Sequence, residues 1–441
     1  MSLMHSPQPP TSLLLFLQSA PPQKTFSAFV KDCELCGMPW HCAAAQQLCV
    51  ALLIRNPLVM KYPPRPSNVC AFLKYFITEL EHMHAGACAG PSLSADVEDA
   101  LSDEGPVHED VMEAYIGCVS NTSQCDQSAF CYRTFYVCGA PRPFVSVRLA
   151  VGQFSNVGLA LWPSALVLAQ LLMQELSGPS PSLLPIAAGR GLRLLELGSG
   201  VGLLPALLSQ LRAYRDKVNC FVLTEYQQEL IDNIVFNMEL QGVAVTPASG
   251  SEPNGGGGPA HAVELLDWTE HDQNCLKLRN WGCNVILAAD CVYDVTLIPS
   301  FVQTLHDALQ AASGDGVAVV VQMHRQQETM RDLFLALVET GLSVRSYRLL
   351  PTAPSCTPAP DVVLTFQRPL SACGEEGNGG MSFVLVSDEM DSTGAFSGLK
   401  GGSEALGSVS GWLGTFFTSM EAVVGIHVVQ LQQAAACDQP C

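Results

Sequence analysis

Apolar residues recur along the first part of the chain with the three- and four-residue spacing of amphipathic helices. The clearest runs are CAAAQQLCVALLIRNP, which begins at Cys42, and NVCAFLKYFITELEHMH, which begins at Asn68. This spacing gathers the apolar side chains on one helical face. The prolines of YPPRPSN between the two runs interrupt helical hydrogen bonding. We therefore predict a helical N-terminal region over residues 1–132.

After this region the pattern changes to short strands that alternate with helices. RTFYVCG and FVSVRLAV, joined by APRP, predict a β-hairpin. Further strands are expected at 192–197, 220–225, 262–268, 283–290, 316–324, 342–350 and 361–368. Strands alternating with helices form a mostly parallel sheet covered on both faces. The predicted fold class is α/β, a Rossmann-like seven-strand sheet that, with the hairpin, occupies residues 133–368.

Residues 369–441 differ in composition from both earlier regions. They are rich in Gly and Ser and end in an apolar segment, GWLGTFFTSMEAVVGIHVVQLQQAAA. Glu421 and His427 interrupt this segment, so we predict a packing or partner helix rather than a membrane span. A second low-complexity run, SGSEPNGGGGPA, predicts an exposed insertion before the third strand of the sheet.

Composition and charge narrow the classes of function. Hydrophobic residues make up 48% of the 441 residues and charged residues 14%, which excludes a mostly disordered chain. The net charge of −19 argues against direct nucleic-acid binding. An acidic surface favours a basic protein partner, although acidity also serves solubility. Residues 85–132 contain no Lys or Arg, and this stretch is either an acidic loop and helix or a docking surface.

The 18 cysteines are scattered and lie largely in apolar runs, as reduced, packed cysteines do. The segment LLLFL near the N-terminus lacks the flanks of a signal peptide. We predict a cytoplasmic protein that is monomeric and does not contact membranes. Five Cys and His residues are of the types that bind zinc, but their spacing is irregular, so we predict no metal site. These residues are Cys33, Cys36, His41, Cys42 and Cys49.

The strongest chemical signal is the run LLELGSGVGLLPALL. An apolar strand ends near Glu196, and Gly198, Gly200 and Gly202 then turn the chain into a helix. Glycines permit both a sharp bend and close approach of a ligand to the backbone. The spacing differs from the G-x-G-x-x-G of dinucleotide sites and matches the E-x-G-x-G-x-G of S-adenosylmethionine sites. The alternative is that these glycines serve only a tight turn.

Acidic and aromatic residues follow the next two predicted strands. Glu225 ends the second strand, where a carboxylate can accept both ribose hydroxyls, or it could serve the next helix as an N-terminal acid. Asp267 and Trp268 end the third strand, where an adenine could be held. For Trp268 simple packing is the alternative. Ligands of open α/β sheets bind at these carboxyl ends.

The fourth strand ends in Ala289 and is followed by Asp290, Cys291, Val292 and Tyr293. This Asp-x-x-Tyr resembles the hallmark of the protein-lysine methyltransferases called methyltransferase family 16, and Trp162 matches a tryptophan that lines the cofactor pocket in that family. The resemblance implies S-adenosylmethionine as cofactor. It implies direct cofactor contacts for Trp162, Gly198, Ser199, Gly200, Glu225, Trp268 and Ala289, with Glu196, Gly202 and Asp267 adjoining them.

The N-terminal region resembles one subfamily, the eukaryotic elongation factor 2 lysine methyltransferases. The likeness spans roughly residues 10 to 368 and is strongest at 56–84 and 150–300, whereas the Gly-rich insertion and the tail depart from it. It implies that the methyl acceptor is a lysine of elongation factor 2.

Methyl transfer needs cofactor and neutral amine held in line. We predict that Asp290 receives the lysine ammonium and that Tyr293 shapes its slot. Helix capping by Asp290 and packing of Tyr293 are the alternatives. His324, which ends the fifth strand, is more typical of a surface residue than of a catalyst.

Two other classes of function stay open. One is a methyltransferase for another protein acceptor, such as a chaperone lysine or a histidine. The other is a non-catalytic binding protein that retains the fold. The glycine spacing disfavours a nicotinamide oxidoreductase.

Overall fold

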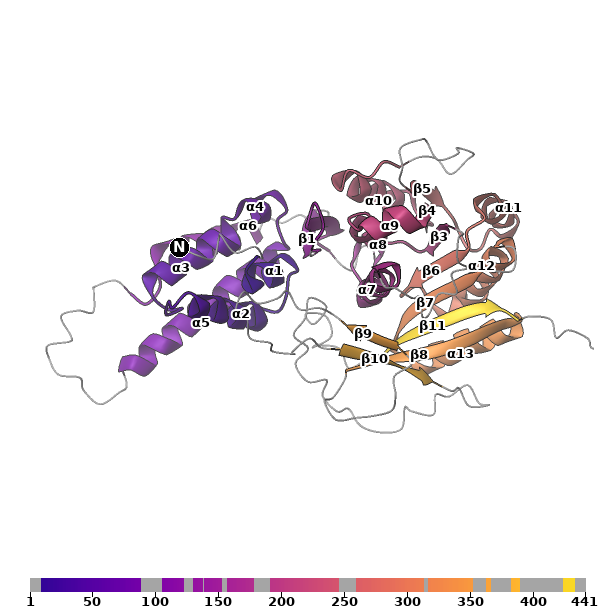
Figure 1. Ribbon diagram of the computed structural model, residues 1–441. Coiled ribbons are helices and arrows are strands. Elements are labelled where there is room, and N and C mark those ends of the chain that lie inside the picture. Colours follow the sequence, from indigo (N-terminus) through magenta and orange to yellow (C-terminus); the bar gives the residue numbers. More distant parts are fainter. Residues whose placement is uncertain are drawn as a thin grey trace, which may run out of the picture.

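The computed structural model describes residues 9–88, 105–122, 130–137, 139–152, 157–177, 191–245, 259–312, 316–351, 362–365, 382–388 and 423–432. Over these residues the chain forms a helical N-terminal region, a two-stranded hairpin and a large sheet with helices on both faces (Figure 1). The predicted α/β class and the helical N-terminal region are therefore confirmed.

The N-terminal region packs its helices around an aromatic core. Its elements are α1 (Thr11–Leu17), α2 (Pro22–Leu35), α3 (Ala43–Cys49), the π-helical η2 (Val50–Ile54), α4 (Pro57–Lys61), α5 (Pro66–Cys88) and α6 (Glu109–Thr122). In α5 the buried Phe72, Phe76 and Leu80 recur every four residues, which creates the predicted apolar face. The rings of Phe72 and Phe76 stack with centroids 6.1 Å apart. The proline-rich segment separates α4 from α5, as predicted.

One helical run of this region, Ala43–Lys61, is long and apolar enough to cross a membrane when judged by length and composition alone. The same run contributes Cys49, Leu53 and Val59 to the buried core of the N-terminal region. A core helix of a globular protein meets the same criterion. Packing in this core therefore accounts for the apolar character of the buried residues of the run.

The hairpin joins the helical region to the sheet. Strands β1 (Phe130–Tyr136) and β2 (Phe144–Ala150) pair antiparallel, with Thr134 opposite Ser146. Their hydroxyl oxygens lie 2.7 Å apart in a buried hydrogen bond. The predicted hairpin is confirmed, although β1 begins at Phe130, three residues before the expected boundary at 133.

The large sheet has the strand order β5-β4-β3-β6-β7-β11-β8-β10-β9. Its strands are β3 (Leu192–Leu197), β4 (Val218–Glu225), β5 (Ala260–Leu265), β6 (Val285–Ala289), β7 (Val317–His324), β8 (Leu342–Pro351), β9 (Val362–Thr365), β10 (Ser382–Asp388) and β11 (Val423–Leu431). The five strands from β5 to β7 are mutually parallel, whereas β11 runs antiparallel to both its neighbours. The seven strands from β5 to β8 are the Rossmann-like sheet.

Strand β11 corrects two predictions about the end of the chain. The apolar segment was expected to be a helix, but its described residues form a strand between β7 and β8, drawn in yellow in Figure 1. Residues 361–368 were expected to supply the seventh strand, whereas β9 lies at the edge of the sheet and pairs only with β10. The alternation of Val424, Ile426 and Val428, all buried, is a strand pattern that the preceding apolar residues obscured.

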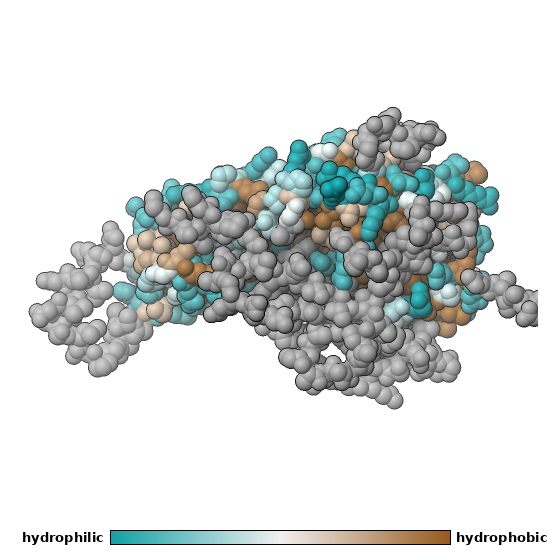
Figure 2. All heavy atoms as spheres, in the orientation of Figure 1, coloured by the Kyte–Doolittle hydropathy of each residue, from teal (hydrophilic) through white to brown (hydrophobic). Residues whose placement is uncertain are grey.

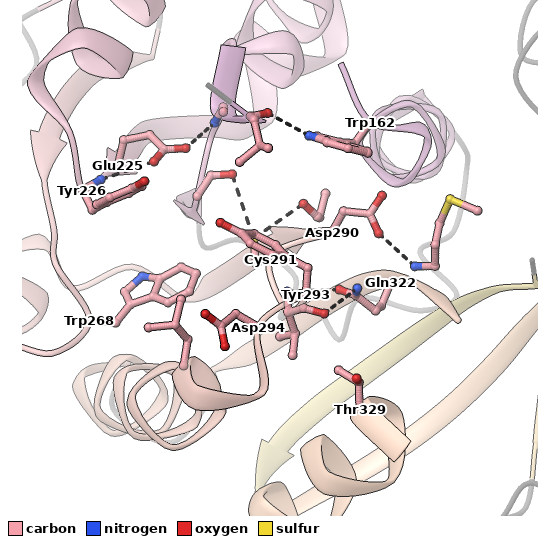
Figure 3. Close-up of a pocket in the computed structure, with 18 of the residues that line it drawn as sticks. Trp162, Glu225, Tyr226, Trp268, Asp290, Cys291, Tyr293, Asp294, Gln322 and Thr329 are labelled. Atoms are coloured by element: carbon pink, nitrogen blue, oxygen red, sulfur yellow. Dashed lines mark hydrogen bonds between the residues drawn. The ribbon is translucent and has the colours of Figure 1, made fainter. Parts of the chain in front are cut away.

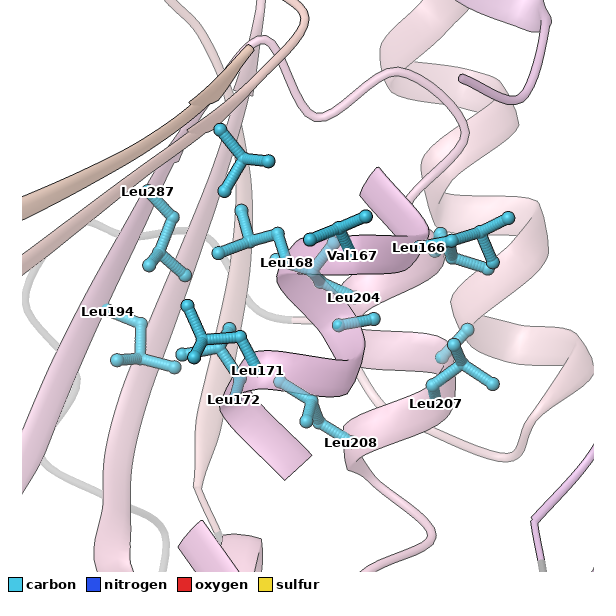
Figure 4. Packing of buried hydrophobic residues seen from close by; sticks show 14 of the residues in the cluster. Leu166, Val167, Leu168, Leu171, Leu172, Leu194, Leu204, Leu207, Leu208 and Leu287 are labelled. Atoms are coloured by element: carbon cyan, nitrogen blue, oxygen red, sulfur yellow. The ribbon is translucent and has the colours of Figure 1, made fainter. Parts of the chain in front are cut away.

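Helices cover the sheet on both faces. They are α7 (Pro163–Ser177), α8 (Leu203–Leu208), α9 (Arg212–Lys217), α10 (Gln228–Leu240), α11 (His271–Trp281), α12 (Ile298–Ala311) and α13 (Gln327–Glu339). Figure 4 shows α7 and α8 against β3, with Leu168, Leu171 and Leu204 buried among neighbouring leucines. A second cluster, which includes Phe301 and Phe334, fills the opposite face. On the face seen in Figure 2, hydrophilic and hydrophobic side chains are mixed over both regions.

Two histidines pack where β11 meets β7. The rings of His324 and His427 stack with centroids 5.4 Å apart, and their Nε2 atoms lie 3.3 Å apart. His427 is fully buried, and its Nδ1 lies 3.0 Å from the Ser346 hydroxyl. His324 is half-buried in this stack. It is therefore neither the surface residue expected from the sequence nor part of the cavity described next.

Candidate active site

The glycine-rich turn after β3 adopts the backbone conformation that its sequence predicts. Gly198, Gly200 and Gly202 have φ values of 68°, 55° and 71°, a left-handed region that favours glycine. A Cβ at position 198 would lie 2.9 Å from the Cys291 sulfur, and one at position 200 would lie 3.3 Å from the Gly158 carbonyl. Both conformation and space therefore require glycine at these two positions.

Glu225 ends β4 and reaches back to this turn. Its Oε1 accepts the Gly200 N–H at 2.7 Å, and its Oε2 accepts the Tyr226 N–H at 3.3 Å. Burial raises the pKa of the Glu225 carboxyl to about 7, and the two hydrogen bonds partly oppose that rise. The following helix has its N-cap at Gln227 and its first-turn acid at Glu229. The alternative that Glu225 serves that helix is therefore wrong.

Glu196 lies within β3 and is only 2% exposed. Burial holds the pKa of its carboxyl well above the ordinary range, with the nearby Glu225 adding to the rise. Ser199 is also buried, and its N–H donates to the Thr224 carbonyl at 3.0 Å. Glu196, Ser199 and Gly202 do not line the cavity, and the Gly202 N–H donates to the Ser199 carbonyl within the turn.

Asp267 and Trp268 follow the end of β5. Asp267 Oδ1 accepts the Thr269 N–H at 2.9 Å, which forms a tight turn and fixes the loop. The Trp268 ring packs edge-on against Phe301, with centroids 5.1 Å apart, and also lines the cavity. Trp268 therefore both packs against the protein core and lines the cavity, so the two interpretations of this residue are compatible.

Asp290 follows β6 in a strained conformation, with a φ of 53° that non-glycine residues rarely adopt. Its N–H donates to the Val321 carbonyl at 2.9 Å, and its Oδ1 accepts the Met323 N–H at 3.0 Å. Burial raises the pKa of the Asp290 carboxyl, while the Met323 N–H, Ser164 and Arg325 oppose that rise. Asp290 is not a helix cap, because Asp294 caps the next helical turn, η5 (Val295–Leu297), through the Thr296 N–H.

Two side chains that the sequence analysis did not single out hold the loop from Asp290 to Tyr293. Gln322 Nε2 donates to the Val292 carbonyl at 2.9 Å, and its Oε1 lies 3.4 Å from the Val292 nitrogen. On the other side, the Cys291 thiol donates to the Leu197 carbonyl at 2.9 Å. A glutamine in the otherwise apolar VAVVVQMH was the only sequence signal for the first contact.

Tyr293 and Trp162 both line the cavity and are labelled in Figure 3. Tyr293 is 57% exposed, so the alternative of a packed core residue is wrong. Burial of part of its ring and the nearby Tyr226 and Glu225 raise the pKa of its hydroxyl. The Trp162 indole N–H donates to the Val157 carbonyl at 3.0 Å, which fixes the ring at the start of α7.

These residues surround one cavity of about 700 Å³ at the carboxyl ends of β3 to β7. Of the residues proposed from the sequence, it is lined by Trp162, Gly198, Gly200, Glu225, Asp267, Trp268, Ala289, Asp290 and Tyr293. Residues that the sequence analysis missed complete the lining, among them Tyr226, Gln322 and Arg325. Among the described residues no group of three or more His, Cys, Asp or Glu side chains is placed to hold a metal ion.

Comparison with known proteins agrees with this geometry. Residues 146–340 match the family described as lysine methyltransferase. The protein-lysine N-methyltransferase EFM3 of Chaetomium thermophilum is 26% identical over 264 residues, which cover 57% of this chain and 71% of the relative.

Two further relatives have slightly lower identities. The protein-lysine N-methyltransferase EEF2KMT of Mus musculus is 23% identical over 233 residues, which cover 52% of this chain and 64% of the relative. An uncharacterized protein of Dictyostelium discoideum is 24% identical over 245 residues, covering 51% and 63%. The chain thus spans just under two thirds of the length of these two relatives.

Proposed function

We propose that this protein transfers a methyl group from S-adenosylmethionine to a lysine side chain of another protein, and that the acceptor is elongation factor 2. The observation that carries the proposal is the position of Asp290. A buried carboxylate, held in a strained conformation by the ends of β6 and β7, faces the same cavity as the glycine turn and Glu225. Strain of this kind concentrates at functional sites.

The cavity fits the proposed cofactor in size and in chemistry. Its volume of about 700 Å³ is in the range of cofactor sites. A Cβ at position 200 would lie 3.3 Å from the Gly158 carbonyl oxygen, which is a tight contact. Glu225 offers the two carboxylate oxygens that ribose hydroxyls need, and Trp268 offers an aromatic wall. Bound S-adenosylmethionine supplies an electrophilic methyl group.

Asp290 and Tyr293 suit a lysine side chain. The Asp290 carboxylate can accept hydrogen bonds from an incoming ammonium, and Tyr293 adds an aromatic ring to the lining of the same cavity. The amine must lose its proton before it can act as a nucleophile. A carboxylate that positions the amine in line with the methyl group lowers the entropic part of the barrier.

The relatives, the net charge and the cysteines support elongation factor 2 as the acceptor and a cytoplasmic setting. Two relatives are named as protein-lysine methyltransferases, and the N-terminal region resembles the elongation factor 2 lysine methyltransferases. Both observations favour a protein as the methyl acceptor. A net charge of −19 suits a basic acceptor surface. The cysteines of the described residues are free thiols, which is compatible with a reducing, cytoplasmic setting. The monomeric state stays a prediction.

The test is to incubate the full chain with radiolabelled S-adenosylmethionine and elongation factor 2. We expect label on a lysine of the factor and a loss of at least about a hundredfold in Asp290→Ala. Asp216→Ala, in an exposed ion pair with Arg212 on α9, is the matched control and should retain full activity.

Two outcomes contradict parts of the proposal. Label on a different protein of a cell lysate, with none on the factor, would reject elongation factor 2 and keep the methyltransferase. Cofactor binding without label on any protein would reject catalysis and favour a binding protein that retains the fold.

A further inference from the structure

The cationic side chain of Arg325 lies beside Asp290. Arg325 follows β7, and its Nη2 lies 3.7 Å from the Asp290 Oδ2. Its guanidinium carbon lies 4.8 Å from the centre of the Trp162 ring. The Asp290 side chain is 4% exposed and that of Arg325 is 43% exposed. The arginine therefore reaches from the cavity mouth towards a buried carboxylate.

A carboxylate and the face of a tryptophan together form a site for a cation. Asp290 is held by the Met323 N–H, and the Trp162 ring is held by the Val157 carbonyl, so neither depends on Arg325 for its position. Under the proposed function, Asp290 is also the carboxylate that receives the lysine ammonium. Two cations cannot share one carboxylate in a buried site without mutual repulsion.

We propose that Arg325 is a specificity-determining residue of the acceptor site: its guanidinium occupies the place of the substrate ammonium between Asp290 and Trp162 and must move aside for lysine to enter. The inference rests on the proposed role of Asp290. An acceptor whose surroundings supply a carboxylate for the displaced arginine would enter more readily than an isolated lysine.

The geometry suits displacement better than a permanent structural role. The distance of 3.7 Å between Arg325 and Asp290 exceeds that of a hydrogen bond. A long, partly exposed side chain that makes such contacts is held weakly. Because the Arg325 side chain is 43% exposed, the guanidinium can leave the carboxylate without being buried elsewhere.

The test uses n-butylamine as a probe that carries the same amine as a lysine side chain. It is titrated into the full chain, saturated with S-adenosylhomocysteine, and binding is followed by ligand-observed NMR. At about pH 8 the amine, with a pKa of about 10.4, is still protonated. We expect Arg325→Gln to bind butylammonium about fivefold more tightly than the unaltered protein, because the competing cation is gone. Arg331→Gln removes an exposed arginine of α13 and should bind like the unaltered protein.

Equal or weaker binding by Arg325→Gln, with the fold confirmed by an unchanged melting temperature, overturns the proposal. Addition of Asp290→Asn to Arg325→Gln should abolish the gain, and a gain that persists overturns it as well. Arg325→Met serves the same comparison if the glutamine variant does not fold. If Arg325→Gln binds butylammonium more tightly but the protein does not methylate elongation factor 2, only the proposed acceptor is rejected. If the protein methylates elongation factor 2 but Arg325→Gln binds butylammonium no more tightly, only the proposed role of Arg325 is rejected.

Discussion

The two halves of the central sheet are assembled from the chain in different ways. From β5 to β7 all strands are parallel, and the turns at their carboxyl ends form the cavity. Beyond β7 the sheet continues with β11, a strand from the last described segment, which runs antiparallel between β7 and β8. The residues that line the cavity therefore lie largely in local strand-to-helix turns, whereas β11, a segment distant in the sequence, completes the sheet.

The residues that form a ligand site and the residues that complete the sheet can lie in separate parts of the sequence. Residues that touch a ligand must follow a strand at a set offset, so they form short motifs. A strand that closes a sheet needs only apolar side chains and free backbone groups on its neighbours. Val424, Ile426 and Val428 meet this need with 2% exposure or less.

The largest effect should come from ending the chain before residue 423. Loss of β11 leaves the facing edges of β7 and β8 unpaired within a buried core, which costs many hydrogen bonds and apolar contacts. We expect insoluble protein and no cooperative melting transition. A soluble truncated chain that still binds S-adenosylmethionine would show that the parallel half of the sheet folds without β11.

A second change affects the parallel half alone. Glu225→Ala removes the carboxylate proposed to accept the ribose hydroxyls, and the dissociation constant for S-adenosylmethionine should rise about ten- to a hundredfold. The melting temperature of the ligand-free protein should change little by comparison. Calorimetric titration measures the dissociation constant, and thermal denaturation measures the melting temperature.

The same carboxyl predicts a pH dependence. Because the pKa of Glu225 is raised to about 7, the carboxyl becomes protonated as the pH falls from 8 to 6, and cofactor binding should weaken over that interval. In Glu225→Gln this dependence should flatten. An equally steep dependence in the variant would assign it to another group.

Gly425→Ala tests the packing of β11 against β7. A Cβ at this position would lie far too close to the His324 ring and 2.7 Å from the His427 Nε2, so the histidine stack would have to shift. We expect the free energy of unfolding to fall by about 1–3 kcal/mol. Gly117→Ala on α6, where nothing lies within 4 Å of the added Cβ, is the matched control and should not destabilise. Equal stability of both variants would contradict the described contact.

The smallest effect concerns the pH dependence of stability. Burial and the nearby His324 hold the pKa of His427 well below its ordinary value, so the folded state keeps this imidazole neutral. The unfolded chain binds a proton below about pH 6.5. The stabilisation is therefore present above that pH and is lost as the pH falls towards the folded pKa.

His427→Leu should make stability less sensitive to pH between 7 and 5, by up to about 1.4 kcal/mol for each pH unit below 6.5. His261 of β5, whose pKa burial lowers to about 4, remains in both proteins and contributes equally. Urea denaturation at several pH values measures the difference. Identical slopes in the two proteins would show that the pKa of His427 is not lowered in the folded state.

Most strands and the residues around the cavity could be predicted because their signals are local. The apolar run before Glu196 coincides with β3, and the offsets that follow placed Gly198, Glu225 and Asp290 at neighbouring strand ends. The helix α11 was not predicted, since its charged sequence buries little beyond Leu278 and Trp281. Its helical state depends on docking against the sheet rather than on its own pattern.

The parallel α/β pattern, the glycine turn and the order of candidate side chains could be predicted, because each depends on residues within one strand or turn. Three features became visible only in the folded protein: the strand between β7 and β8, the contacts of Gln322 and Cys291 with the Asp290 loop, and the contacts of Arg325 with Asp290 and Trp162. These are contacts between segments far apart in the chain. Their formation depends on how the whole sheet closes, which no local periodicity encodes.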